Sequence, residues 1–196
     1  MAATGAPSFA ALRTRAARGD AEAAFQLAAY HGSGQARMRG IPRDEQVAAQ
    51  YYMQACEAGH TEAAFNVGMC YHTGSGVEKN VEKAVEHYRI AASNGHLEAQ
   101  KSLVTCYTTG AGVSADPAMA ARYCRLAAEQ GDADMMFATA QRFSTGSGFT
   151  QDEDKAMHFY KRAAAEGHAQ ARKILDGQAQ SSFRLDTPWG CSWNQA

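Results

Sequence analysis

Apolar side chains recur along the chain with the spacing of a helix face, in paired stretches that glycines separate. In the second unit they stand at Ala63, Val67, Cys70 and Tyr71, and again at Ala84, Tyr88, Ala91 and Ala92. Both stretches follow the spacing i, i+4, i+7, i+8, which places these side chains on one side of an α-helix. A Gly-Ser-Gly turn at 74–76 lies between them. The pattern therefore predicts two amphipathic helices joined by a glycine turn.

The same unit repeats along the chain. A glycine followed by histidine or aspartate opens each copy, at Gly19, Gly59, Gly95, Gly131 and Gly167. The first two glycines are 40 residues apart and each later pair is 36 apart, because the first unit has a longer loop at residues 31–40. Many other positions keep the step of 36, and we refer to such equivalent positions as a repeat column. A fixed period of this length is the signature of a tandem array.

The array predicts an all-α fold. Two helices joined by a short turn lie antiparallel, and neither can bury its apolar face alone, so the hairpins stack into an α-solenoid. Few isoleucines and valines and many alanines also favour helices over sheet. We divide the sequence into an N-terminal capping helix (1–18), four repeats (19–58, 59–94, 95–130, 131–166), a truncated capping repeat that Gly177 ends (167–177), and a tail (178–196).

The motifs of the second unit identify a family. Gly59-His-Thr-Glu-Ala-Ala-Phe-Asn-Val-Gly68, Tyr71, Gly74-Ser-Gly-Val77, Glu82-Lys-Ala84, His87-Tyr88 and Ala91-Ala92 resemble the Sel1-like repeat, a longer relative of the tetratricopeptide repeat. The resemblance covers residues 19–175. It implies a right-handed superhelix of antiparallel helix pairs, with the first helix of each pair lining the concave surface. Proteins of this family act mainly as adaptors and assembly scaffolds.

Composition excludes several classes of protein. With 196 residues, 45% hydrophobic and 20% charged, the chain has globular values, and its net charge of −1 disfavours nucleic-acid binding. No apolar run is long enough to span a membrane. Five dispersed cysteines without a C-x-x-C pair predict neither a disulfide scaffold nor a metal site, and we expect no cofactor. We expect a cytoplasmic protein; a mitochondrial one is the alternative, because Arg13, Arg15 and Arg18 precede the first acid.

A polar stripe remains on the first helices once the core columns are removed. These residues are predicted to bind a protein or peptide partner in the groove on the concave surface. They are Gln26, Asn66, Met69, Ser102, Thr105 and Gln141. Amide and hydroxyl groups can form hydrogen bonds with an extended peptide backbone. The alternative interpretation is an ordinary solvated helix surface.

Histidines and acids at the helix starts have a structural interpretation. His60, His96 and His168 share a repeat column with Asp20 and Asp132, so they are predicted to cap the first helices. The acids that follow two residues later, Glu22, Glu62, Glu98 and Asp134, complement the helix dipole or form an acidic rim for a basic partner.

The tail holds both tryptophans, Trp189 and Trp193. Two such side chains outside the repeats predict either a segment that folds back over the last repeat or a docking motif for a partner.

The favoured function is a non-enzymatic adaptor that binds a protein through the concave surface of the solenoid. A subunit or assembly factor of a larger complex, in mitochondria or elsewhere, is one alternative. A redox, haem or copper assembly factor would need closely spaced or paired cysteines, and the five cysteines are dispersed. Hydrolase-like activity, proposed for cysteine-rich relatives, is disfavoured because no serine has lysine three positions later. In that branch a helix-end cysteine like Cys56 is stapled to the next helix, where this chain has Ala63 and Ala64.

Overall fold

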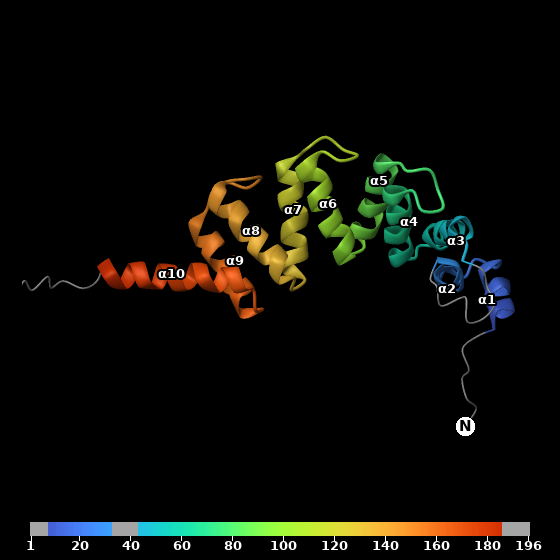
Figure 1. Cartoon of the computed structure of the whole chain (residues 1–196), viewed down its shortest axis with the longest axis horizontal. Coiled ribbons are helices and arrows are strands. Elements are labelled where there is room, and N and C mark those ends of the chain that lie inside the picture. The colour runs from blue at the N-terminus through green and yellow to red at the C-terminus, as the bar shows by residue number, and fades with distance from the viewer. Residues whose placement is uncertain (1–7, 33–42, 186–196) are drawn as a thin grey trace, which may run out of the picture. The chain divides into compact units, whose positions relative to one another are not determined.

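The computed structural model describes residues 8–32 and 43–185, with side chains described as far as residue 177. In those ranges every regular element is an α-helix (Figure 1). The ten helices are α1 (Phe9–Ala16), α2 (Ala21–Gly32), α3 (Glu45–Glu57), α4 (Thr61–Thr73), α5 (Val81–Ser93), α6 (Leu97–Thr109), α7 (Pro117–Glu129), α8 (Ala133–Thr145), α9 (Glu153–Ala165) and α10 (Ala169–Leu185). The all-α solenoid predicted from the repeat is confirmed.

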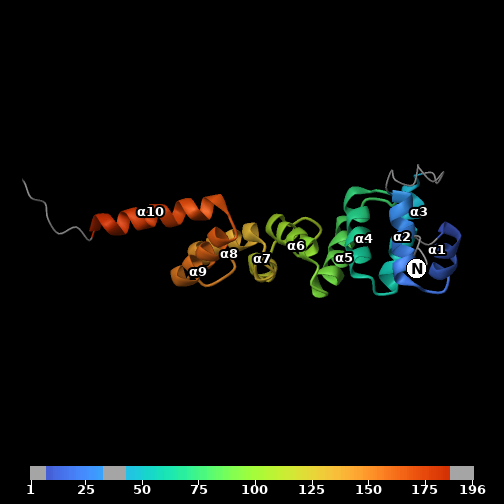
Figure 2. The same cartoon turned by 90° about the horizontal axis from the view of Figure 1, so that it is seen from below.

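The helices gather into two compact units, an N-terminal unit ending at Tyr123 and a C-terminal unit beginning at Cys124. In the N-terminal unit each helix from α1 to α5 packs against the next, so that α2 with α3 and α4 with α5 form hairpins, and α1 covers α2 (Figure 2). In the C-terminal unit α8 and α9 form a hairpin and α10 packs against α9.

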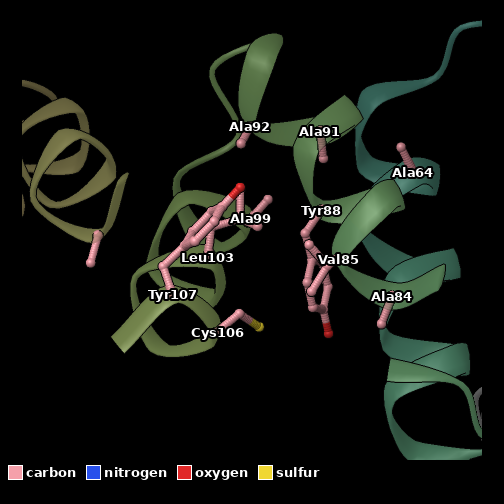
Figure 3. Close-up of a cluster of buried hydrophobic side chains, with 11 residues drawn as sticks. Ala64, Ala84, Val85, Tyr88, Ala91, Ala92, Ala99, Leu103, Cys106 and Tyr107 are labelled. Atoms are coloured by element: carbon pink, nitrogen blue, oxygen red, sulfur yellow. The ribbon is translucent and has the colours of Figure 1, made fainter. Parts of the chain in front are cut away.

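Small residues bring the paired helices close together in the N-terminal unit. Tyr88 of α5 is 2% exposed and lies in a core with Leu103 and Tyr107 of α6 (Figure 3). A Cβ atom on Gly68 of α4 would lie 2.6 Å from the Tyr88 ring and 3.2 Å from the carbonyl oxygen of Ala84. The ring therefore fills the space that the missing side chain leaves, and a glycine is needed at this crossing.

The turn inside each hairpin is closed by one repeated hydrogen bond. The backbone N–H of Asn80, the N-cap of α5, donates to the carbonyl oxygen of Tyr71 at 2.9 Å. In the first hairpin the N–H of Asp44 donates to the carbonyl oxygen of His31 at 3.1 Å. The enlarged first loop therefore ends with the same closure as its shorter counterparts. Residues 33–42 of that loop lie outside the described ranges.

The end of the C-terminal unit differs from the prediction. We expected Gly177 to end the last helix, but α10 continues to Leu185. A single glycine inside a helix costs about 1 kcal/mol relative to alanine, and the glutamines and alanine that follow it favour helix, so the glycine does not terminate it. In the columns where α4 packs Ala64 and Gly68 against its hairpin partner, α10 has Arg172 and Asp176, a polar face suited to the end of an array.

Candidate protein-binding surface

The predicted stripe is distributed over the first helices of the repeats. In the N-terminal unit the structure places Gln26 on α2, Asn66 and Met69 on α4, and Ser102 and Thr105 on α6. Thr105 is exposed, and Met69 retains 38% of its surface. Gln141 is exposed on α8, in the C-terminal unit. Trp189 and Trp193 lie outside the described residues.

The polar members of the stripe use their donors within their own helices. Asn66 donates through Nδ2 to the carbonyl oxygen of Glu62 at 2.9 Å. The Ser102 hydroxyl donates to the carbonyl oxygen of Glu98 at 2.8 Å. Oδ1 of Asn66 and the lone pairs of the Ser102 hydroxyl keep acceptor capacity for a ligand. Asn66 and Ser102 therefore offer hydrogen-bond acceptors to a partner.

Met69 is the apolar element of this stripe. The hydroxyl of Tyr88 donates to its sulfur at 3.2 Å, so the thioether is held at the edge of the hairpin core. Burial raises the pKa of Tyr88 to about 12, which keeps this donor protonated. A flexible thioether fits apolar partners of varied shape.

The capping prediction for the histidines is confirmed. His60 and His96 are the N-caps of α4 and α6, and each accepts a hydrogen bond at Nδ1 from a backbone N–H of the first turn, at 3.2 Å. Asp20 and Asp132 accept the equivalent bond through a carboxylate oxygen. Because Nδ1 accepts, the proton of the neutral ring lies on Nε2.

Each capping histidine also joins two successive repeats, which the sequence analysis missed. In the N-terminal unit Nε2 of His60 lies 3.2 Å from a carboxylate oxygen of Glu22, and the ring stacks on Phe25 with centroids 4.4 Å apart. His96 repeats this arrangement with Glu62 at 2.9 Å and Phe65 at 4.6 Å. We call these the Phe–His–Glu clusters.

The C-terminal unit has an equivalent of these clusters in Phe137, His168 and Asp134. A sequence signal for them existed. Phe25, Phe65, Lys101 and Phe137 share one repeat column. Each phenylalanine of this column is followed, 35 or 31 residues later, by a capping histidine. Lys101 is instead followed by the capping aspartate Asp132.

Hydrogen bonds at the start of α2 lower the pKa values of two carboxyl groups. A hydrogen bond from Gln26, followed by one from His60, lowers the pKa of Glu22. The backbone N–H of Ala23, with a hydrogen bond from Arg15, lowers the pKa of Asp20. These acids at the start of a helix therefore accept hydrogen bonds from neighbouring groups in addition to interacting with the helix dipole.

A thiol and an imidazole meet between α3 and α5. Sγ of Cys56 lies 3.8 Å from Nδ1 of His87, whose ring stacks on Tyr71. Burial raises the pKa of the Cys56 thiol and lowers that of the His87 imidazole. Both shifts favour the neutral thiol and imidazole over the thiolate and imidazolium that a cysteine nucleophile uses.

Among the side chains that the structure describes, no three of His, Cys, Asp and Glu group closely enough to hold a metal ion. Within the described helices, none has the length and apolar character needed to cross a membrane.

Comparison with known proteins identifies the repeat. The Sel1 repeat model matches residues 21–60, 61–96, 102–132 and 133–168. None of the curated proteins matches the sequence.

Two solved structures are similar over most of the chain. A protective antigen of uropathogenic Escherichia coli with an SLR fold is 30% identical, with a TM-score of 0.73 over 87% of this chain and 36% of its own. A Sel1 repeat protein from Oxalobacter formigenes is 28% identical, with a TM-score of 0.74 over 84% of this chain and 66% of its own. The chain thus spans about a third of the first protein's length and about two thirds of the second's. Sel1 repeat proteins generally mediate protein–protein interactions, and four matched stretches that cover most of the sequence show that this chain belongs to the Sel1 repeat family.

Proposed function

We propose that this chain is an adaptor that binds a protein partner through the partly exposed stripe on its first helices. The observation that carries the proposal is the exposure of Met69 among hydrogen-bond acceptors on α4. Asn66 and Ser102 each donate a hydrogen bond to a carbonyl oxygen of their own helix. Their side-chain oxygens can therefore accept hydrogen bonds from the backbone N–H groups of an extended segment. An apolar anchor with polar groups around it is the usual composition of a binding site.

The chain offers a matched control for this proposal. Two large apolar side chains in the described structure remain exposed, Met69 at 38% and Ile90 at 46%. Met69 belongs to the stripe, whereas Ile90 lies on α5, a second helix. Replacing either one by aspartate adds the same charge at an exposed apolar position, but only one change falls in the proposed site.

The experiment begins with the partner that the unaltered chain captures from the source cells. Its affinity is then measured by calorimetry for the unaltered chain, Met69→Asp and Ile90→Asp. We expect Met69→Asp to weaken binding about tenfold or more, because the anchor loses its apolar burial, and Ile90→Asp to leave the affinity unchanged. Equal effects of the two variants would refute the site.

A triple change at Asn66, Ser102 and Gln141 to alanine tests the acceptors. Helicity should stay unchanged while partner affinity falls. Unaltered affinity would mean that these groups do not contact the partner.

A further inference from the structure

An open pocket of about 490 Å³ lies in the N-terminal unit, away from the stripe. It is lined by residues of α1, α2 and α3, namely Phe9, Arg13, His31, Val47, Gln50, Tyr51 and Gln54. Its volume falls in the range of sites for small ligands and side chains. None of these seven lining residues is acidic.

Three rings form the walls of this pocket. The rings of His31 and Tyr51 stack with centroids 5.9 Å apart, and Phe9 meets His31 edge-on at 5.8 Å. Nδ1 of His31 is buried and has no hydrogen-bond partner among the described residues. Because this nitrogen is buried, a ligand in the open pocket contacts Arg13 and the ring faces rather than Nδ1.

The contact between α5 and α6 shows what occupies this place elsewhere in the chain. Arg89 of α5 donates to the hydroxyl of Tyr107 on α6, from Nε at 3.0 Å and from a terminal nitrogen at 2.6 Å. Arg13 and His31 stand in the same two repeat columns. The imidazole is shorter than a phenol and has no hydroxyl, so Arg13 lacks the oxygen that Arg89 binds.

Arg13 also lacks a partner on its own helix. In the same column of the C-terminal unit, Arg125 lies 3.5 Å from Glu129, four residues later. The residue four after Arg13 is Ala17, and α1 contains no acid. Within the described residues, the pocket thus joins a guanidinium that has no carboxylate partner to an aromatic wall.

We propose that this pocket binds an acidic peptide segment of a partner protein. A carboxylate of the segment pairs with Arg13, and a neighbouring aromatic side chain packs against the rings of Phe9 and Tyr51. Arginine remains charged at all relevant pH values, so its guanidinium donates to the carboxylate. The binding surface is separate from the stripe on the first helices.

Blocked tetrapeptides provide direct probes. One has a glutamate next to a phenylalanine, the second has glutamine in place of the glutamate, and the third has alanine in place of the phenylalanine. Binding is followed by NMR titration of the full chain, observing the aromatic signals of His31 and Tyr51. We expect the first peptide to bind, and each substitution in the peptide to weaken binding about tenfold or more.

Three variants locate the site. His31→Tyr rebuilds the arrangement of Arg89 with Tyr107, so it should fill the pocket and abolish peptide binding. Arg13→Gln, at an exposed position that should not disturb folding, should weaken binding about tenfold. Arg18→Gln removes a nearby charge outside the pocket and should change nothing.

Several results would overturn the proposal. Peptide binding that survives both His31→Tyr and Arg13→Gln would place the site elsewhere. An equal loss in Arg18→Gln would show general charge attraction. Binding of 3-phenylpropanoate without binding of the first peptide would assign the pocket to a small acid. None of these results depends on the stripe, so they leave the proposed adaptor function separately testable.

Discussion

Gly112 sits where the loop of one hairpin touches the helix start of the hairpin before it. A Cβ atom on this glycine would lie 2.5 Å from the carbonyl oxygen of Val81 and 2.6 Å from its carbonyl carbon. Val81 is the first residue of α5, so the contact sets the distance between successive repeats. Gly112→Ala therefore tests whether close backbone approach, rather than loop flexibility, requires glycine here.

A neighbouring glycine separates the two effects. Gly112 has a φ of 69° and Gly110 a φ of 77°, so alanine at either position adopts the left-handed region and costs about 1–2 kcal/mol. A Cβ on Gly110 would meet its nearest neighbour, the backbone nitrogen of Ala115, at 3.5 Å, which is an ordinary contact. The alanine at 112 must also push the loop off α5, and overpacking of this kind costs a further 1–3 kcal/mol, roughly.

We therefore expect Gly110→Ala to lower the free energy of unfolding by about 1–2 kcal/mol and Gly112→Ala by about 2–5 kcal/mol. The assay is urea unfolding of the full chain, followed by far-UV circular dichroism. Hydrogen exchange at the amides of the first turn of α5 should accelerate only in Gly112→Ala. Equal losses in the two variants, with unchanged exchange at α5, would refute the close-approach argument.

Three further predictions concern buried side chains and caps. His96→Ala should lower the free energy of unfolding by about 1 kcal/mol, and His96→Asn should restore most of it because asparagine also caps a helix; urea unfolding measures both, and equal losses would contradict the capping role. The raised pKa of Tyr88 adds stability that is complete below pH 10 and is lost as pH rises towards 12. Tyr88→Phe should therefore flatten the fall in the free energy of unfolding at alkaline pH. Parallel plots of this free energy against pH for the two proteins would argue against it. Cys124 is fully buried and burial raises its pKa, so a thiol reagent at pH 8 should modify it more slowly than the partly exposed Cys70. Mass spectrometry follows the two reactions, and similar rates would contradict the burial of Cys124.

The fold could be predicted because the repeat carries redundant information. Each hairpin repeats the same apolar columns and glycines, so an ambiguous residue in one copy is resolved by its equivalents in the others. Gly177 had no such support, since the last copy is incomplete. There the local preference of the following residues for helix prevailed over the glycine.

The details of the candidate site were harder to predict because they depend on contacts between repeats. Nothing in the first helix alone tells that Glu22 pairs with His60, 38 residues away. The sequence placed the polar side chains of Asn66 and Ser102 on the stripe, but their bonds to the carbonyls four residues earlier depend on rotamers. The pocket at His31 required comparison of two hairpins in three dimensions.

Site-specific photo-crosslinking tests the central claim, that the first helices contact the partner, most directly. A crosslinking amino acid is placed singly at positions 66 and 105 on the stripe, and at positions 86 and 122 on second helices. The account predicts covalent partner adducts from 66 and 105 and none from 86 and 122. Adducts formed only from 86 and 122 would contradict it.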